Sequence, residues 1–181
     1  MKWRGYFACL RSGMKQKPAL DDITIRTELR PGDIGYITYL HGKLYEDEYD
    51  YGIEFEAYVA EGMSEFFRSY DPQTNRVWIC EHEGKIVGFM LLMNREVAAQ
   101  LRYFLILPEY RGIGLGQRLM EYYMEYMLSC GYASSYLWTT SDLTAAAGLY
   151  KKFGFQLTEE KQSDSFGKKP VLMQKYELHI A

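Results

Sequence analysis

Cysteine and histidine are scarce in this chain. Its 181 residues include three cysteines and three histidines, each far from the next of its kind, and no two cysteines form a C-x-x-C pair. An odd number of widely separated cysteines argues against a disulfide scaffold, and the same spacing argues against a Cys/His zinc site. We therefore expect no metal, and free thiols at Cys9, Cys80 and Cys130.

Long apolar runs and an excess of positive charge are also missing. The longest apolar run, Ile86–Met93, is far shorter than the roughly 18 residues that a membrane span requires. The run Tyr6–Leu10 is shorter than the core of a signal peptide. The formal net charge of −3 argues against a nucleic-acid partner, whose phosphates many basic side chains would have to neutralise. We expect a cytoplasmic protein whose partners include neither a membrane nor a nucleic acid.

The composition that is present suits one folded domain. The chain is 48% hydrophobic and 16% aromatic, which excludes disorder over most of its length, and its length is typical of a single domain. Residues 1–17 are basic and show no apolar periodicity. We expect a loosely ordered leader over residues 1–22 and a single domain over residues 23–181. Met14 would serve as an alternative start, so it stays open whether residues 1–13 belong to the native protein.

Hydrophobic periodicity divides the domain into helices and strands. Helical spacing predicts helices from Asp33 to about Tyr45 and over Glu54–Phe67. It also predicts a helix that follows the glycine loop and ends near Ser129, and a short helix that follows Ser141-Asp142 and ends at Gly154. Alternating or continuous apolar runs predict strands at 23–29, 76–81, 86–93, 97–107, 132–140, 155–159 and 171–178. Asp33 and Ser141-Asp142 are the expected helix caps. This order indicates an α/β (α+β) protein with a mixed sheet covered by helices.

One segment is strongly acidic. Between Leu44 and Phe67 there are eight Asp or Glu residues and no Lys or Arg. Such a run is commonly a solvated helix face. Its functional interpretation is an entrance that attracts a cationic substrate.

A glycine-rich loop, Arg111-Gly112-Ile113-Gly114-Leu115-Gly116, lies between an apolar strand and an amphipathic helix. Glycines let the backbone approach a ligand closely, and the helix N-terminus offers free N–H groups, which suits a pyrophosphate. A purely structural turn is the alternative. A Walker loop is excluded because Gln117 and Arg118 stand where Lys and Ser/Thr belong, and the Rossmann spacing fails at Gln117.

Two segments of the chain resemble one known superfamily. Leu107–Gly116 fits the (Q/R)-x-x-G-x-G/A loop of the GCN5-related N-acetyltransferases (GNAT), and Ala147–Phe155 fits their L-Y-x-x-x-G-F segment. The expected element order agrees over residues 23–178. More narrowly, Leu44-Tyr45 with 55–60, and 137–139 with 143–147, resemble the acetyltransferase half of MarR–GNAT fusion proteins, without the DNA-binding half.

The resemblance implies a fold and a donor. The fold would be a mixed, mostly antiparallel sheet of about six to seven strands flanked by about four helices, with a parallel strand pair that splays apart at the cofactor site. Acetyl-CoA would be the co-substrate, its pantetheine arm paired with the main chain of Phe104, Leu105 and Ile106. Arg111 and Arg118 would add charge near its phosphates. The pyrophosphate would bind N–H groups of the loop residues Gly112, Ile113, Gly114, Leu115, Gly116 and Gln117.

The resemblance also implies that Tyr150 is the general acid, because it takes that position of the family pattern. A phenol with a pKa near 10 can hydrogen-bond or protonate a leaving thiolate. Leu143 stands where many relatives carry a cofactor-binding asparagine, and Trp138 stands where some carry a glutamate base. The general base is therefore unassigned.

The base and the acceptor pocket have several candidates. A water relay, or a carboxylate among Glu46, Glu48, Glu54 and Glu56, is open as the base, and Arg102, Tyr45 and Trp138 are candidate pocket residues. We predict a metal-independent N-acetyltransferase that moves an acetyl group from acetyl-CoA directly to a primary amine, with a cationic acceptor. The alternative is a catalytically weak acyl-CoA-binding sensor. The oligomeric state stays open, a homodimer included.

Overall fold

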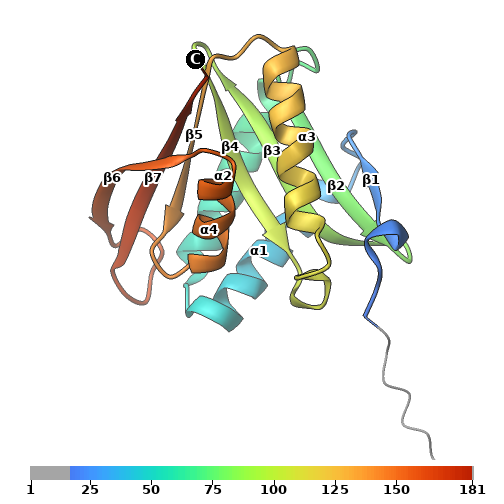
Figure 1. The fold of residues 1–181 in the computed structure, drawn as a ribbon. Coiled ribbons are helices and arrows are strands. Elements are labelled where there is room, and N and C mark those ends of the chain that lie inside the picture. The colour runs from blue at the N-terminus through green and yellow to red at the C-terminus, as the bar shows by residue number, and fades with distance from the viewer. Residues whose placement is uncertain (1–16, 181) are drawn as a thin grey trace, which may run out of the picture.

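The computed structural model describes residues 17–180, so Cys9 and most of the expected leader lie outside the described residues. The described part contains four α-helices and seven strands (Figure 1). The helices are α1 (Asp33–Tyr49), α2 (Ile53–Arg68), α3 (Leu115–Ser129) and α4 (Thr144–Lys152). The strands are β1 (Thr24–Arg26), β2 (Arg76–His82), β3 (Lys85–Arg95), β4 (Ala98–Ile106), β5 (Ser134–Thr140), β6 (Gln156–Ser163) and β7 (Val171–His179).

The strands form one sheet in the order β1-β2-β3-β4-β5-β7-β6. Every neighbouring pair is antiparallel except β4–β5, which is parallel. Helices α3 and α4 cover one face of the sheet and α1 and α2 cover the other (Figure 1). The expected mixed, mostly antiparallel sheet flanked by four helices is confirmed. None of the helices within residues 17–180 has the length and apolar character that crossing a bilayer requires.

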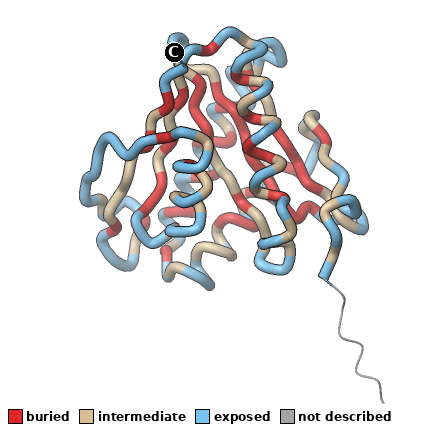
Figure 2. The backbone as a smooth tube through the Cα atoms, viewed as in Figure 1, coloured by how far each residue is buried: buried red, intermediate tan, exposed pale blue. Residues whose placement is uncertain are grey.

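Each face of the sheet carries its own hydrophobic core. Tyr123 and Leu119 of α3 pack on one face, and Val59 of α2 and Ile37 of α1 pack on the other. The central strand β3 is buried on both faces from Ile86 to Met93, which explains its continuous apolar sequence. Figure 2 shows the buried residues concentrated in these central strands and the inner sides of the helices. The central strands are therefore a rigid support for a binding site at the edge of β4.

The parallel pair separates soon after it forms. Its paired residues are Ala99 with Ser135 and Gln100 with Tyr136, yet β4 continues to Ile106 and β5 to Thr140. Beyond Gln100 the facing edges of the two strands have no partner in each other. The sheet is therefore splayed open between β4 and β5, as expected.

Neither expected helix cap acts as one. The N-cap residue of α1 is Gly32, with a φ of 98°, and that of α4 is Leu143. Asp33 is instead the first residue of α1, and its carboxylate accepts hydrogen bonds of 2.8 Å from Arg26 Nη1 and Nη2 and one of 2.6 Å from the Arg30 N–H. The nearly buried Arg26–Asp33 ion pair fastens α1 to β1. The strand expected over residues 23–29 is shorter in the structure, because only Thr24–Arg26 pair with β2.

This ion pair generates a stability prediction. Asp33→Asn should lower the free energy of unfolding by about 3 kcal/mol, because Arg26 would keep a buried charge whose one other carboxylate partner among residues 17–180 is Glu81 at 2.8 Å. Asp47→Asn is the matched control on the same helix, since Asp47 pairs with Lys43 in solvent and should cost under about 0.5 kcal/mol. Urea denaturation measures both, and equal effects of the two substitutions would contradict the assignment.

The same pair gives stability a pH dependence. Burial alone would raise the pKa of Asp33, but hydrogen bonds from Arg26 and Arg30 outweigh burial and hold that pKa below its ordinary value. A depressed folded-state pKa contributes stability above the unfolded pKa of about 3.9 and loses it as the pH falls through the folded value. The acid loss of stability should therefore be smaller in Asp33→Asn than in the wild type.

Candidate functional site

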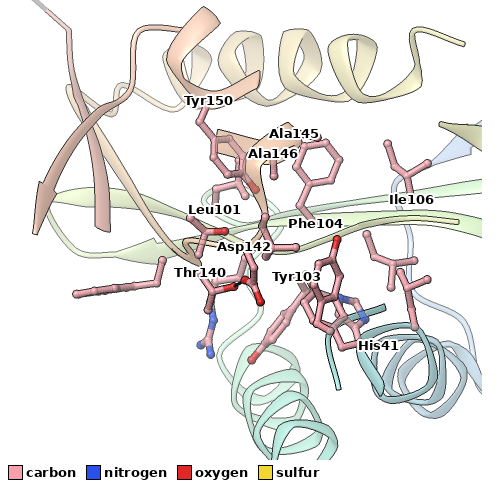
Figure 3. Close-up of a pocket in the computed structure, with 18 of the residues that line it drawn as sticks. His41, Leu101, Tyr103, Phe104, Ile106, Thr140, Asp142, Ala145, Ala146 and Tyr150 are labelled. Carbon is pink, nitrogen blue, oxygen red and sulfur yellow. Dashed lines mark hydrogen bonds between the residues drawn. The ribbon is translucent and has the colours of Figure 1, made fainter. Parts of the chain in front are cut away.

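A cavity of about 410 Å³ lies where β4 and β5 separate (Figure 3). Its walls come from β4 beyond Gln100, from the end of β5, from the start of α4 and from α1 and α2. Figure 3 shows Tyr150 reaching in from α4, Phe104 rising from β4, and Thr140 and Asp142 at the end of β5. The cavity is thus the continuation of the splayed wedge.

The β4 edge offers free main-chain groups to this cavity. The Leu107 N–H donates to the Val87 carbonyl on the β3 side. Because peptide groups alternate between the two edges of a strand, those of Leu105 also face β3, and those of Phe104 and Ile106 face the wedge. Arg111 Nε donates to the Ile106 carbonyl at 2.9 Å. The Phe104 groups and the Ile106 N–H therefore have no strand partner on that edge.

The glycine loop has the conformation that the sequence predicts for close backbone approach. Gly112 and Gly114 have φ values of 75° and 92°, a region that disfavours residues with a side chain. Gly114 is the N-cap residue of α3, and the first helical bond runs from the Arg118 N–H to the Gly114 carbonyl. The N–H groups of Leu115, Gly116 and Gln117 precede that bond, so the turn presents them to a ligand.

Charged side chains surround this loop. Arg111 forms an ion pair with Glu48 of α1 at 2.9 Å, so it ties the loop to α1. The Lys152 ammonium donates to Gln117 Oε1 at 2.7 Å, and the Lys17 ammonium lies beside Gly112. Sequence reasoning missed both lysines, because Lys17 lies in no motif and Lys152 stands at a variable position of the L-Y-x-x-x-G-F segment, far from the loop in the chain. Within residues 17–180, no group of three or more His, Cys, Asp or Glu side chains is placed to hold a metal ion.

Tyr150 is nearly buried and points into the cavity (Figure 3). Its ring centroid lies 6.4 Å from that of Phe104. Its hydroxyl has no hydrogen-bond partner among residues 17–180. The hydroxyl oxygen is not fully buried, so it is accessible from the cavity that Tyr150 lines. Burial raises the pKa of Tyr150. The phenol is therefore protonated at neutral pH and free to donate a hydrogen bond.

Aromatic side chains form the wall of the cavity on the α1–α2 side. Phe166, from the loop between β6 and β7, packs against Tyr51 and Phe55 with ring centroids 5.3 and 5.0 Å apart. These contacts bring the start of α2 and the β6–β7 loop together. The aromatic wall consists of Tyr45, Tyr49, Tyr51, Phe55, Tyr58 and Phe166. Sequence reasoning identified Tyr45 as a pocket candidate and missed the others, which appeared to be ordinary core residues.

The carboxylates of the cavity differ from those expected. Among the described residues that line it, Asp142 is the sole carboxylate, and none of Glu46, Glu48, Glu54 and Glu56 lines it. Asp142 Oδ1 accepts from Thr140 Oγ1 at 2.5 Å, and Thr140 Oγ1 lies 2.8 Å from the Tyr51 hydroxyl. This hydrogen-bonded chain runs from the aromatic wall to the cavity mouth. The carboxylates of the acidic run therefore do not line the cavity, although other residues of the same segment do.

The family comparison decides the relationship of this chain to known proteins. Residues 42–155, more than half of the chain, match the "Acetyltransferase (GNAT) family". The chain belongs to the GNAT family. A sequence relative, the Escherichia coli "Uncharacterized N-acetyltransferase YjgM", is 31% identical over 98 residues, 52% of this chain and 59% of the relative. The Salmonella typhimurium "Peptidyl-lysine N-acetyltransferase YjaB" is 32% identical over 113 residues, 62% of this chain and 70% of the relative.

Solved structures share the GNAT fold of this chain. YncA of Salmonella typhimurium, a "putative acetyltransferase" with its cofactor acetyl-CoA, aligns with a TM-score of 0.67 and 15% identity, covering 88% of this chain and 95% of the other. Spermidine N-acetyltransferase of Vibrio cholerae, in complex with CoA and spermine, aligns with a TM-score of 0.62 and 17% identity, covering 88% and 96%. At these identities the likeness shows the fold.

The wedge of this GNAT chain contains a bulge in β4. Phe89 pairs with Leu105 and Leu91 pairs with Arg102, so Tyr103 and Phe104 together oppose one residue of β3. Tyr103 has a φ of 54°, in the left-handed region. As a result two consecutive side chains, Arg102 and Tyr103, face α1 and α2, whereas alternation predicts opposite faces.

The bulge is held by residues of both covering helices. His41 of α1 packs edge-on against Tyr103 with ring centroids 5.8 Å apart, and burial lowers the pKa of His41 to about 4, so its ring is neutral. On α2, a Cβ added at Gly62 would lie 1.7 Å from the Tyr103 hydroxyl oxygen. The missing side chain of Gly62 therefore leaves the space that the Tyr103 hydroxyl occupies.

Gly62→Ala should consequently destabilise the protein by about 1–3 kcal/mol, because Tyr103 must move in a packed interior. Gly35→Ala is the matched control in α1, where an added Cβ has nothing within 4 Å. It should raise the unfolding free energy by about 0.5–1 kcal/mol through helix propensity. Thermal unfolding of both variants checks the pair, and a stabilised Gly62→Ala would contradict this view of the bulge.

Proposed function

We propose that this chain is an acetyl-CoA-dependent N-acetyltransferase that moves the acetyl group directly to a primary amine. One observation carries the proposal: the splayed β4–β5 pair puts a free strand edge, a glycine-rich helix N-terminus and the Tyr150 hydroxyl around one cavity. The GNAT relatives named above are called N-acetyltransferases, and the solved neighbours contain acetyl-CoA or CoA.

The donor would lie along the wedge. Its pyrophosphate would accept hydrogen bonds from the N–H groups of Gly112, Ile113, Gly114, Leu115, Gly116 and Gln117. The partial positive charge of the α3 N-terminus favours an anion there, and Lys17, Arg118 and Lys152 would add charge. The amides of the pantetheine arm would pair with the β4 edge at Phe104 and Ile106. The family resemblance predicts three β4 residues for this pairing. The main-chain groups of Leu105 face β3, so the proposed pairing with pantetheine is limited to Phe104 and Ile106.

Two groups of this chain would act on the reacting atoms. The amine nitrogen attacks the thioester carbon, the C–S bond breaks, and the thiolate leaves with the electron pair. The Tyr150 hydroxyl would donate a hydrogen bond to that sulfur and supply its proton. The acceptor enters protonated, so its nitrogen must lose one proton before it attacks and a second as the amide forms. The second proton replaces the one that Tyr150 gives to the sulfur, and the first needs a proton acceptor in the site. The Tyr51–Thr140–Asp142 chain is the proposed acceptor, because Asp142 is the sole carboxylate among the described lining residues.

The acceptor of this transfer is proposed to enter as a cation. An alkylamine is protonated at neutral pH, and the segment from Leu44 to Phe67, which contributes residues to the cavity lining, carries eight carboxylates that would attract a cation. The alternative, an acyl-CoA sensor without turnover, is separated from the enzyme by the first prediction below. The narrower likeness to MarR–GNAT fusion proteins, the domain start at residue 23, the cytoplasmic location and the homodimer stay predictions.

Tyr150→Phe tests the proposed acid. It should lower kcat by roughly 10²–10⁴-fold, because the thiolate would leave without a hydrogen-bond donor, while the Kd for acetyl-CoA changes little. Tyr176→Phe is the control, since Tyr176 is a buried tyrosine 6.2 Å from Tyr150 between ring centroids. Thiol release with an amine panel and calorimetry with acetyl-CoA give the two readouts. Wild-type binding without turnover on any amine would favour the sensor.

The phosphate loop is tested by Gly114→Ala. Gly114 and Gly131 bracket α3, and both have positive φ values, 92° and 77°. Alanine at either site should cost roughly 1 kcal/mol of stability through backbone strain. Only Gly114→Ala should also weaken acetyl-CoA binding, because only that residue lies at the N–H groups proposed for the pyrophosphate. Equal acetyl-CoA affinities in the two variants would contradict the loop's proposed role.

A further inference from the structure

Arg102 is a nearly buried cation that lines the cavity. Its side chain is only 10% exposed. Its guanidinium carbon lies 4.7 Å from the Tyr103 ring centroid and 5.5 Å from that of Tyr58. The β4 bulge turns Arg102 toward α2, on the same side as the aromatic wall. Arg102 therefore stands on the acceptor side of the proposed site, away from the glycine loop.

The charge of Arg102 is only partly compensated. Glu65 of α2 accepts from Arg102 Nη1 at 3.3 Å, but the same carboxylate binds Arg95 more closely, at 2.7 Å. Among the described residues, no carboxylate other than Glu65 lies within 4.0 Å of the Arg95 or Arg102 guanidinium nitrogens. Two guanidinium charges thus share one carboxylate, which leaves a net charge of about +1 beside the cavity.

Arg102 also keeps a free donor. Its Nη2 donates to the Tyr58 hydroxyl at 3.1 Å and its Nη1 donates to Glu65. Its Nε has no hydrogen-bond acceptor within residues 17–180 and is not fully buried, so it is free to donate to a ligand. A guanidinium with free N–H groups on one edge is suited to a carboxylate, which it binds with charge-assisted hydrogen bonds.

Apart from Glu65, three carboxylates of the acidic run are paired with other cations. Glu48 is paired with Arg111, Asp47 with Lys43, and Asp50 with Lys168, at 2.9, 2.6 and 2.8 Å. The Tyr58 and Tyr103 rings lie beside the guanidinium, and the aromatic wall lines this side of the cavity. We propose that Arg102 binds a carboxylate of the acceptor, so that the preferred acceptors are amines that carry a carboxylate on an apolar body. This inference rests on the proposed N-acetyltransfer and names its substrate class.

Matched pairs of amines test the preference. Thiol release from acetyl-CoA would be measured with phenylalanine against phenethylamine, leucine against isopentylamine, and aminohexanoate against hexylamine. These pairs vary the apolar body and the distance between amine and carboxylate. The expected result is a kcat/KM at least about tenfold higher for the carboxylate-bearing member of one or more pairs, the size expected for a hydrogen-bonded charge. A wild type that favours the member without a carboxylate in all three pairs overturns the proposal.

Variants assign the preference to Arg102. Arg102→Gln should abolish it by raising KM for the carboxylate-bearing member, with little change for its partner amine or for the Kd of acetyl-CoA. Arg95→Gln, which removes the other arginine on Glu65, should keep it. Glu65→Gln should lower KM for the carboxylate-bearing member, because Arg102 loses its competing carboxylate, and this variant decides the question if Arg102→Gln does not fold. Equal losses on both members of a pair in Arg102→Gln overturn the proposal.

Failure of the proposed N-acetyltransfer would look different, because no amine of any pair would then release thiol. The carboxylate site is still testable in that case by calorimetric titration of the CoA-loaded protein with phenylalanine and with phenethylamine. Tighter binding of phenylalanine that disappears in Arg102→Gln supports the site. Equal binding of the two ligands overturns it.

Discussion

The early end of the β4–β5 pairing is the constraint on which the rest of this structure depends. Two adjacent parallel strands normally satisfy each other's main-chain groups, and here they do so only as far as Gln100 and Tyr136. Beyond that point β4 keeps its other edge bonded to β3, so it stays rigid while presenting free groups to the wedge. The cavity, the exposed end of α3 and the position of Tyr150 all follow from this separation.

The two sides of the wedge are built from different chemical groups. The donor side consists of backbone: a strand edge and the first turn of a helix. The acceptor side consists of side chains from α1, α2 and the β6–β7 loop, which Phe166 brings against Tyr51 and Phe55. Backbone groups bind the same donor whatever the surrounding sequence. Side chains at the acceptor side can change without altering the sheet, so this side sets which amine is accepted.

The sequence allowed the donor side to be predicted more fully than the acceptor side. Element order, the loop at Gly112–Gly116 and the place of α4 follow from periodicity and from glycine, whose conformational role is visible in the residue type. The bulge at Tyr103 is not visible, because tyrosine carries no preference for a positive φ and its space is supplied by Gly62, far along the chain. Strand alternation alone would place Arg102 and Tyr103 on opposite faces of the sheet.

Charge counting along the chain gave a similarly incomplete picture. The run from Leu44 to Phe67 is acidic as a sequence, but Arg111, Lys43 and Lys168 reach it from other elements and neutralise several of its carboxylates. The reverse holds beside the cavity, where Arg95 and Arg102 converge on one glutamate. Electrostatic attraction toward the entrance and recognition inside the cavity are therefore separate properties. Under the proposed N-acetyltransfer, a cationic amine attracted by the helix surface would meet a guanidinium inside the cavity, and an acceptor that carries both charges would match both fields.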